Sequence, residues 1–81
     1  MDELELKIGV PKEVTPPADK KIVVQNTMGT TDDPLFVSTH GDKNKKWINI
    51  KSGDVVSFDQ KMYFLQNSWA VFVFPVVEIG A

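Results

Sequence analysis

The fold class follows from residues 47–58, which read WINIKSGDVVSF. Two runs rich in β-branched and aromatic residues flank the segment KSGD at 51–54. This segment has the composition of a tight turn, because glycine adopts positive φ angles without steric cost. The stretch therefore predicts a β-hairpin, with strands over 47–50 and 55–58.

Similar short runs recur along the chain at 21–25, 35–39, 62–65 and 69–74, separated by turn residues. Spacings of about 8–12 residues between short strands are typical of sandwiches and small barrels. A sustained helical period is missing throughout. We predict an all-β protein: a small antiparallel β-sandwich or barrel over residues 21–81, preceded by an extended, proline-containing arm over residues 1–20.

The composition is that of one small folded domain of 81 residues, with 42% hydrophobic residues and a net charge of -2. The chain has no cysteine, which excludes disulfides and thiolate metal sites. A domain of this size buries only about 60% of the surface of its unfolded chain. We therefore expect marginal stability, or stability supplied by a partner.

The arm contains a strict alternation, in which apolar residues are separated by charged residues and a glycine. The apolar positions are Leu4, Leu6, Ile8 and Val10. Alternate side chains of a strand point to opposite faces, so the pattern predicts a strand with one apolar side. Two placements remain open: an edge strand on its own body, or a strand added to a neighbouring subunit across the stiff spacer that Pro16 and Pro17 form.

Residues 69–77 read WAVFVFPVV and do not alternate, so both faces of this strand must be covered. We expect Val71 and Val73 to face the core. Phe72 and Phe74 are then difficult to bury in so small a body, and we predict that Trp69, Phe72 and Phe74 mediate self-association.

The chain offers little material for catalysis, and we predict neither an enzyme nor a cofactor. The one histidine, His40, lies between Ser38 and Asp42 in a predicted loop, where we expect it to be solvated. Asp32 and Asp33 precede a proline in a polar turn. A cation site could draw only on these two residues, His40 and Asp42, and their spacing matches no calcium loop. We predict no metal, and the longest apolar run is too short to cross a membrane.

A different function is open to the lysine loop and two aromatic residues: Lys43, Lys45, Lys46, Trp47 and Tyr63. Positive charge beside aromatic rings can bind single-stranded nucleic acid, and the rings could equally bind a carbohydrate. A pI of 5.2 argues against nucleic acid, because release of counterions needs several concentrated cations.

Three segments carry a family resemblance: VQNT at 24–27, LFVS at 35–38 and WINIKSGDVVSF at 47–58. Residues 22–65 resemble small β-sandwich virion proteins of tailed bacteriophages, of the decoration (cement) or head-fibre type. The resemblance implies a non-enzymatic protein that sits on a capsid lattice, often as a trimer, with an extended terminus gripping the shell or a neighbour. It implies no catalytic or ligand-binding residue.

We therefore expect a structural virion protein, assembled in the host cytoplasm, that self-associates and binds a capsid protein through Leu4, Leu6, Ile8 and Val10. Two alternatives remain: a ligand-binding module that uses the lysine loop, and a phage-encoded adaptor or inhibitor.

Overall fold

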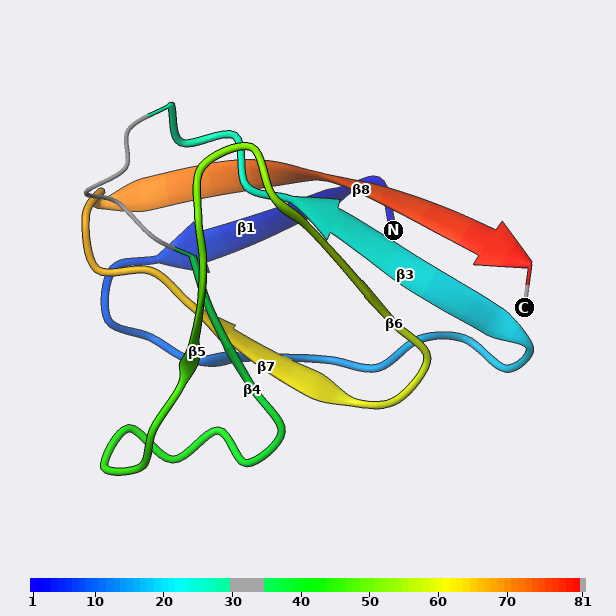
Figure 1. Ribbon diagram of the computed structural model, residues 1–81, viewed down its shortest axis with the longest axis horizontal. Coiled ribbons are helices and arrows are strands. Elements are labelled where there is room, and N and C mark those ends of the chain that lie inside the picture. Colours follow the sequence, from blue (N-terminus) through cyan, green and yellow to red (C-terminus); the bar gives the residue numbers. More distant parts are fainter. Residues whose placement is uncertain (30–34, 81) are drawn as a thin grey trace.

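A computed structural model describes residues 1–29 and 35–80 and has two antiparallel four-stranded sheets packed together (Figure 1). The strands are β1 (Glu3–Lys7), β2 (Lys12–Val14), β3 (Lys20–Gln25), β4 (Leu35–Ser38), β5 (Ile48–Ile50), β6 (Val55–Phe58), β7 (Met62–Leu65) and β8 (Val71–Gly80). The first sheet has the order β1-β8-β3-β6, and the second has the order β2-β7-β4-β5. The prediction of an all-β sandwich is confirmed.

The predicted hairpin over residues 47–58 is wrong, although both of its strands form. β5 pairs with β4 in the second sheet, whereas β6 pairs with β3 in the first. The turn between them crosses from one sheet to the other. The buried Asn26, just after the end of β3, holds this crossing in place. Its side-chain Nδ2 donates to the carbonyl of Ile50 at 2.7 Å, and its main-chain carbonyl accepts from the amide of Gly53 at 2.8 Å.

The N-terminal strand folds onto its own body, which was the first of the two placements left open. β1 pairs with β8 in a register that sets Leu4 opposite Phe74 and Leu6 opposite Phe72. Leu4 is 0% exposed and Leu6 is 1% exposed, so both belong to the core. The prediction that these two leucines bind a partner is therefore wrong. Ile8 and Val10 lie beyond the strand and are exposed.

The two faces of β8 are the reverse of the prediction. Phe74 is 0% exposed and Phe72 is partly buried against the core, whereas Val71 and Val73 are exposed. The register with β1 explains this, because it places both rings on the face that carries the buried leucines. Phe74 is therefore unavailable for self-association.

The chain continues β8 past Pro75 to Gly80, well beyond the predicted end at residue 74. Proline lacks the N–H that a ladder needs, and it is tolerated where that group has no partner. The pairing of β8 with β3 begins at Val76, so Pro75 lies just before the ladder that would have needed its N–H. The short strand β2 was not predicted; it follows the Gly9 turn and pairs with β7.

Candidate functional site

The outer face of the first sheet carries an uncovered apolar stripe along β8. We call it the β8 stripe; it consists of Val71, Val73, Pro75, Val77 and Ile79. The exposed fractions are 47% for Val71, 43% for Val73, 58% for Val77 and 50% for Ile79. Val55 of β6, on the same face, is 56% exposed. Contiguous exposed aliphatic residues on one face are a candidate surface for binding another surface.

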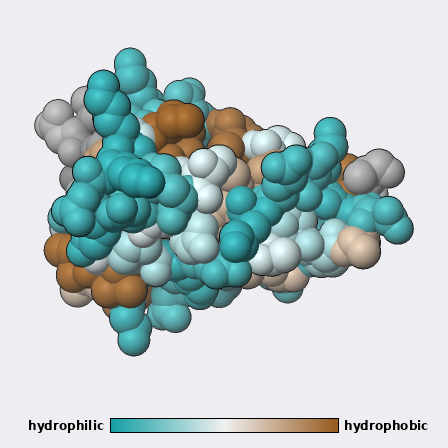
Figure 2. Space-filling model, turned by 90° about the horizontal axis from the view of Figure 1, so that it is seen from below, coloured by the Kyte–Doolittle hydropathy of each residue, from teal (hydrophilic) through white to brown (hydrophobic). Residues whose placement is uncertain are grey.

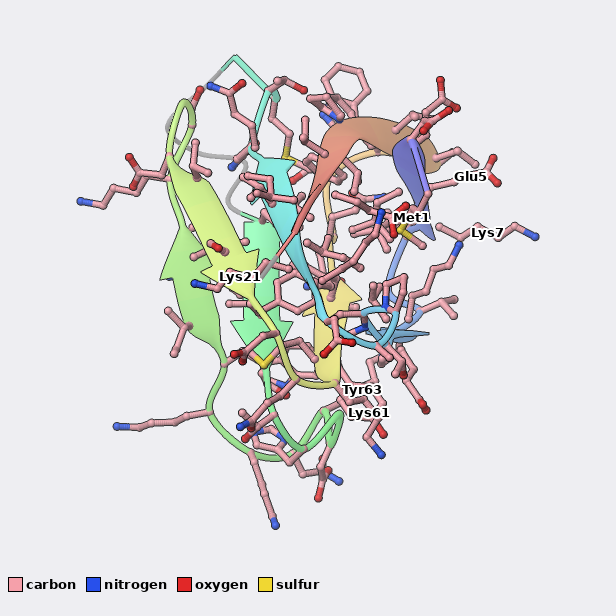
Figure 3. The ribbon with its side chains drawn as sticks, turned by 90° about the vertical axis from the view of Figure 1, so that its right-hand side faces the viewer. Met1, Glu5, Lys7, Lys21, Lys61 and Tyr63 are labelled. Atoms are coloured by element: carbon pink, nitrogen blue, oxygen red, sulfur yellow. The ribbon has the colours of Figure 1, made fainter. Side chains whose placement is uncertain are left out.

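Charged side chains lie on both sides of the β8 stripe. The register places Glu3, Glu5 and Lys7 of β1 beside Pro75, Val73 and Val71 respectively. On the other side, Lys21 of β3 lies beside Ile79. Figure 3 shows Glu5 and Lys7 near the right-hand edge, on β1, and Lys21 farther left, on β3. The open face thus has an apolar centre with a mainly acidic flank on β1 and a lysine on β3.

On the second sheet, in contrast, the loop over residues 39–47 covers part of the outer face, at Tyr63 of β7. The backbone of Gly41 lies directly on the ring of Tyr63, so close that a Cβ atom there would come within 2.7 Å of the ring. The amino group of Lys43 donates to the carbonyl of Gly9 and holds the loop against the first turn. Seen from below, hydrophilic residues dominate the surface and hydrophobic residues form small separate groups (Figure 2).

The residues of the alternative ligand site take part in this covering. Trp47 donates from Nε1 to the carbonyl of Asp42 at 2.9 Å, and its ring packs edge-on against His40. One face of Tyr63 contacts Gly41, and Lys61 lies 5.8 Å from the centroid of the Tyr63 ring. Lys45 and Lys46 are exposed. Trp47 and Tyr63 are therefore engaged in packing contacts and do not form an open platform for stacking.

His40 is in a loop as predicted, but it is half-buried and bonded at both ring nitrogens, so the expectation of a solvated side chain is wrong. Its Nδ1 accepts from the amide of Asp42 at 2.9 Å, which requires Nδ1 to be unprotonated. Nε2 then carries the proton and donates to the carbonyl of Lys46 at 2.8 Å. The imidazole ties the two ends of the lysine loop together.

Ser38 and Asp42 also form hydrogen bonds within the loop, and the hydroxyl of Ser38 lies 3.3 Å from Nδ1 of His40. The hydroxyl of Ser38 accepts the amides of His40 and Gly41 at 3.1 and 2.9 Å. The Asp42 carboxylate accepts the amide of Asn44 at 2.9 Å, so it does not orient the imidazole. These contacts are those of a loop closed by its own polar side chains.

The predicted absence of a metal rested partly on Asp32 and Asp33, which lie outside the described residues. Within residues 1–29 and 35–80, no three acidic or histidine side chains gather in a way that could hold a metal ion. The same residues form no helix long and apolar enough to cross a membrane.

A shallow groove of about 320 Å³ lies where the chain turns from β1 into β2. Its walls are Glu5, Lys7, Val10, Pro11 and Lys12. The Nζ atom of Lys12 approaches the carbonyl of Glu5 at 3.4 Å across the groove. The groove therefore runs beside the outer edge of β1.

Sequence reasoning missed the valines of the β8 stripe as surface residues. The signal that could have identified them was the difference in side-chain size along β8. A small sandwich fills its interior with the larger aromatic rings, which leaves the smaller valines for the surface. No protein-family model and no curated protein matches this sequence significantly.

Proposed function

We propose that this protein is a non-enzymatic structural subunit whose copies pack together through the outer face of the first sheet. The β8 stripe is the observation that supports this function, because it leaves aliphatic side chains in water along the whole strand. In this proposal the protein decorates a capsid lattice, which is the role that the sequence resemblance implies.

A second copy suits this face because the β8 stripe is self-complementary. A two-fold axis parallel to β8 lays the stripe of one copy on the stripe of the other. The same rotation places the acidic β1 flank of each copy toward the β3 flank of its partner, on which Lys21 lies. Like-charged flanks are thereby kept apart, and the sheets meet in the aligned packing common in sandwiches.

The energy of this contact is modest. Complete burial of an aliphatic side chain contributes about 1.5–3 kcal/mol, so a half-exposed one contributes roughly 1 kcal/mol when it is covered. Two copies together cover eight valine and isoleucine side chains of their stripes, or roughly 8 kcal/mol before the cost of association. That cost is about 4–15 kcal/mol, so one such contact is weak. Binding becomes strong when many copies act together, as on a lattice.

The first test introduces a charge into the β8 stripe. In the Val73→Asp variant, the average mass in solution should fall, because burial of a carboxylate at the interface disfavours assembly. The matched control is Ile48→Asp, which changes a 65% exposed residue on the second sheet and should leave the mass unchanged. Sedimentation velocity from about 10 μM to 1 mM measures both variants. A wild-type chain that stays monomeric over this range contradicts the proposal.

The second test concerns the particle. Quantitative mass spectrometry of purified virions from the source of the sequence should detect the protein at a fixed ratio to the major capsid protein. Virions that carry the Val73→Asp chain should contain less of it. Complete virions that lack the protein contradict the proposed location, whatever its oligomeric state.

A further inference from the structure

We propose a second contact between copies: the outer edge of β1 pairs antiparallel with β1 of another copy. This inference rests on the proposed function, because it supplies the contact that lets assembly continue beyond the pair joined through the β8 stripe. It depends on different atoms, namely the main chain of an edge strand.

The hydrogen bonds of β1 show which of its groups are turned outward. The amide of Val76 donates to the carbonyl of Asp2 at 3.1 Å, and the amide of Ile8 donates to the carbonyl of Ala70 at 3.0 Å. The main-chain groups of the even-numbered residues of β1 therefore form hydrogen bonds with β8. In an antiparallel ladder the direction alternates, so the main-chain groups of Glu3, Glu5 and Lys7 point away from β8.

This edge has no strand beside it in the described part of the chain, where β1 pairs with β8 alone. Two of its carbonyls have other donors: Lys7 accepts the amide of Val10 at 3.2 Å, and Glu5 accepts the exposed amino group of Lys12 at 3.4 Å. The Lys12 bond is long and its donor is flexible, so an incoming strand can replace it. The carbonyl of Lys7 keeps the amide of Val10 and accepts the incoming amide on its second lone pair. The groove lies along this edge, between β1 and residues 10–12, so an incoming strand has to displace the Lys12 side chain from it.

The charges along β1 favour a second copy in one register. With a two-fold axis at Glu5, perpendicular to the sheet, Glu3 of each copy lies opposite Lys7 of the other. Leu4 then lies beside Leu6 on the buried face, where it continues the core. Only the two Glu5 side chains meet as like charges, next to the Lys12 amino groups that line the groove. A register in which Glu3 faces Glu5 would pair like charges twice, at a cost in stability.

Pairing in this register joins the two four-stranded first sheets into one continuous sheet of eight strands. Because the two-fold axis is perpendicular to the sheet, both β8 stripes lie on the same face. That face can then pack on further copies. A subunit with two separate isologous contacts forms assemblies larger than a dimer, as a lattice component requires.

Cysteine cross-linking tests the register directly, because the chain contains no cysteine of its own. In the proposed pair, the Cα atoms of the two Glu5 residues are about 5.5 Å apart, and disulfides form at about 4.4–6.8 Å. Glu5→Cys should therefore form a covalent dimer under mild oxidation. Glu3→Cys should not, because its symmetry mate is about 15 Å away, at about 3.4 Å for each of four residues along the strand and about 5.5 Å across. An equimolar mixture of Glu3→Cys and Lys7→Cys should cross-link.

Equal cross-linking of Glu5→Cys and Glu3→Cys, or failure of Glu5→Cys to cross-link at 1 mM, would overturn the proposal. Neither result affects the β8 stripe, so failure of this contact is distinguishable from failure of the proposed function.

Charge reversal provides a readout without oxidation. In the Val73→Asp background, which removes the stripe contact, the protein should sediment as an edge-paired dimer at high concentration. Addition of Lys7→Glu should convert it to a monomer, and addition of Glu3→Lys to that variant should restore the dimer. A dimer that Lys7→Glu leaves unchanged would show that the edges do not meet in this register.

Discussion

Single residues hold the turns of this sandwich, and Gln66 contributes most. It is 0% exposed, and its amide forms four hydrogen bonds. Nε2 donates to the carbonyls of Leu6 and Trp69 at 3.1 and 2.6 Å, while Oε1 accepts the amides of Ser68 and Trp69, each at 2.9 Å. This one side chain therefore closes the turn before β8 and attaches it to the end of β1.

We predict that Gln66→Leu lowers the free energy of unfolding by about 3 kcal/mol. The substitution leaves main-chain amides and carbonyls of the turn without a partner, and each buried group left unpaired costs about 1–3 kcal/mol. Urea unfolding followed by tryptophan fluorescence measures the change. The neighbouring Asn67→Ala substitution is the control, since Asn67 is exposed; we expect a change within about 0.5 kcal/mol. Equal effects of both substitutions would contradict the role given to Gln66.

At the scale of the element, β1 is an integral strand and not a detachable arm. Leu4 and Leu6 are buried, and β1 completes one edge of the first sheet. Each buried leucine contributes about 1.5–3 kcal/mol, compared with about 5–15 kcal/mol for the whole stability of a typical domain. Removal of β1 therefore removes a large share of the free energy of unfolding.

We expect deletion of residues 1–10 to unfold the protein, and Leu6→Ala to destabilise it by about 2–5 kcal/mol. Ile8→Ala is the control, because Ile8 is 51% exposed, and we expect it to cost less than 1 kcal/mol, as is typical of a surface site. Circular dichroism and urea unfolding measure all three variants. A cooperative unfolding transition in the chain of residues 11–81 would show that the body does not need β1.

At the scale of the whole molecule, the first residue of the chain is tied to the last strand. The amino group of Met1 donates to the carboxylate of Glu78 in β8. This hydrogen bond lowers the pKa of Glu78 and raises the pKa of the Met1 amino group from its ordinary value of 8.0.

The two shifts define a pH window. The lowered pKa of Glu78 stabilises the fold above the carboxyl's ordinary pKa of 4.5, and this contribution is lost as the pH falls through the folded value. The raised amine pKa stabilises the fold below 8.0, and this contribution is lost as the pH rises through the folded value. Between these limits the ion pair is complete.

We predict that NMR titration gives a midpoint for Glu78 below 4.5, and that Glu78→Gln returns the Met1 amine toward 8.0. The control is Glu5→Gln on the neighbouring strand, which should leave the titration of Met1 unchanged. Both side chains are partly exposed, Met1 at 33% and Glu78 at 23%, so the effect on stability should be small and should decrease further with salt. An amine pKa that Glu78→Gln does not alter would contradict the contact.

The sequence by itself determined that this protein is built of short strands, because alternation, β-branched runs and turn residues are local properties. Seven of the eight strands overlap segments predicted from those properties. The exception is β2, whose sequence KEV has two charged residues and a single apolar one. The alternation over residues 3–10 likewise showed that β1 has one apolar side.

Only the tertiary structure decided which strands pair, which faces are covered and which apolar residues remain in water. Asn26 draws the turn at 51–54 across to β3, so two strands adjacent in sequence belong to different sheets. The Phe72 and Phe74 rings turn inward because Leu4 and Leu6 face them from β1. The valines that alternate with these rings, Val71 and Val73, must then face outward. These choices depend on contacts between residues far apart in the chain, which no local pattern encodes.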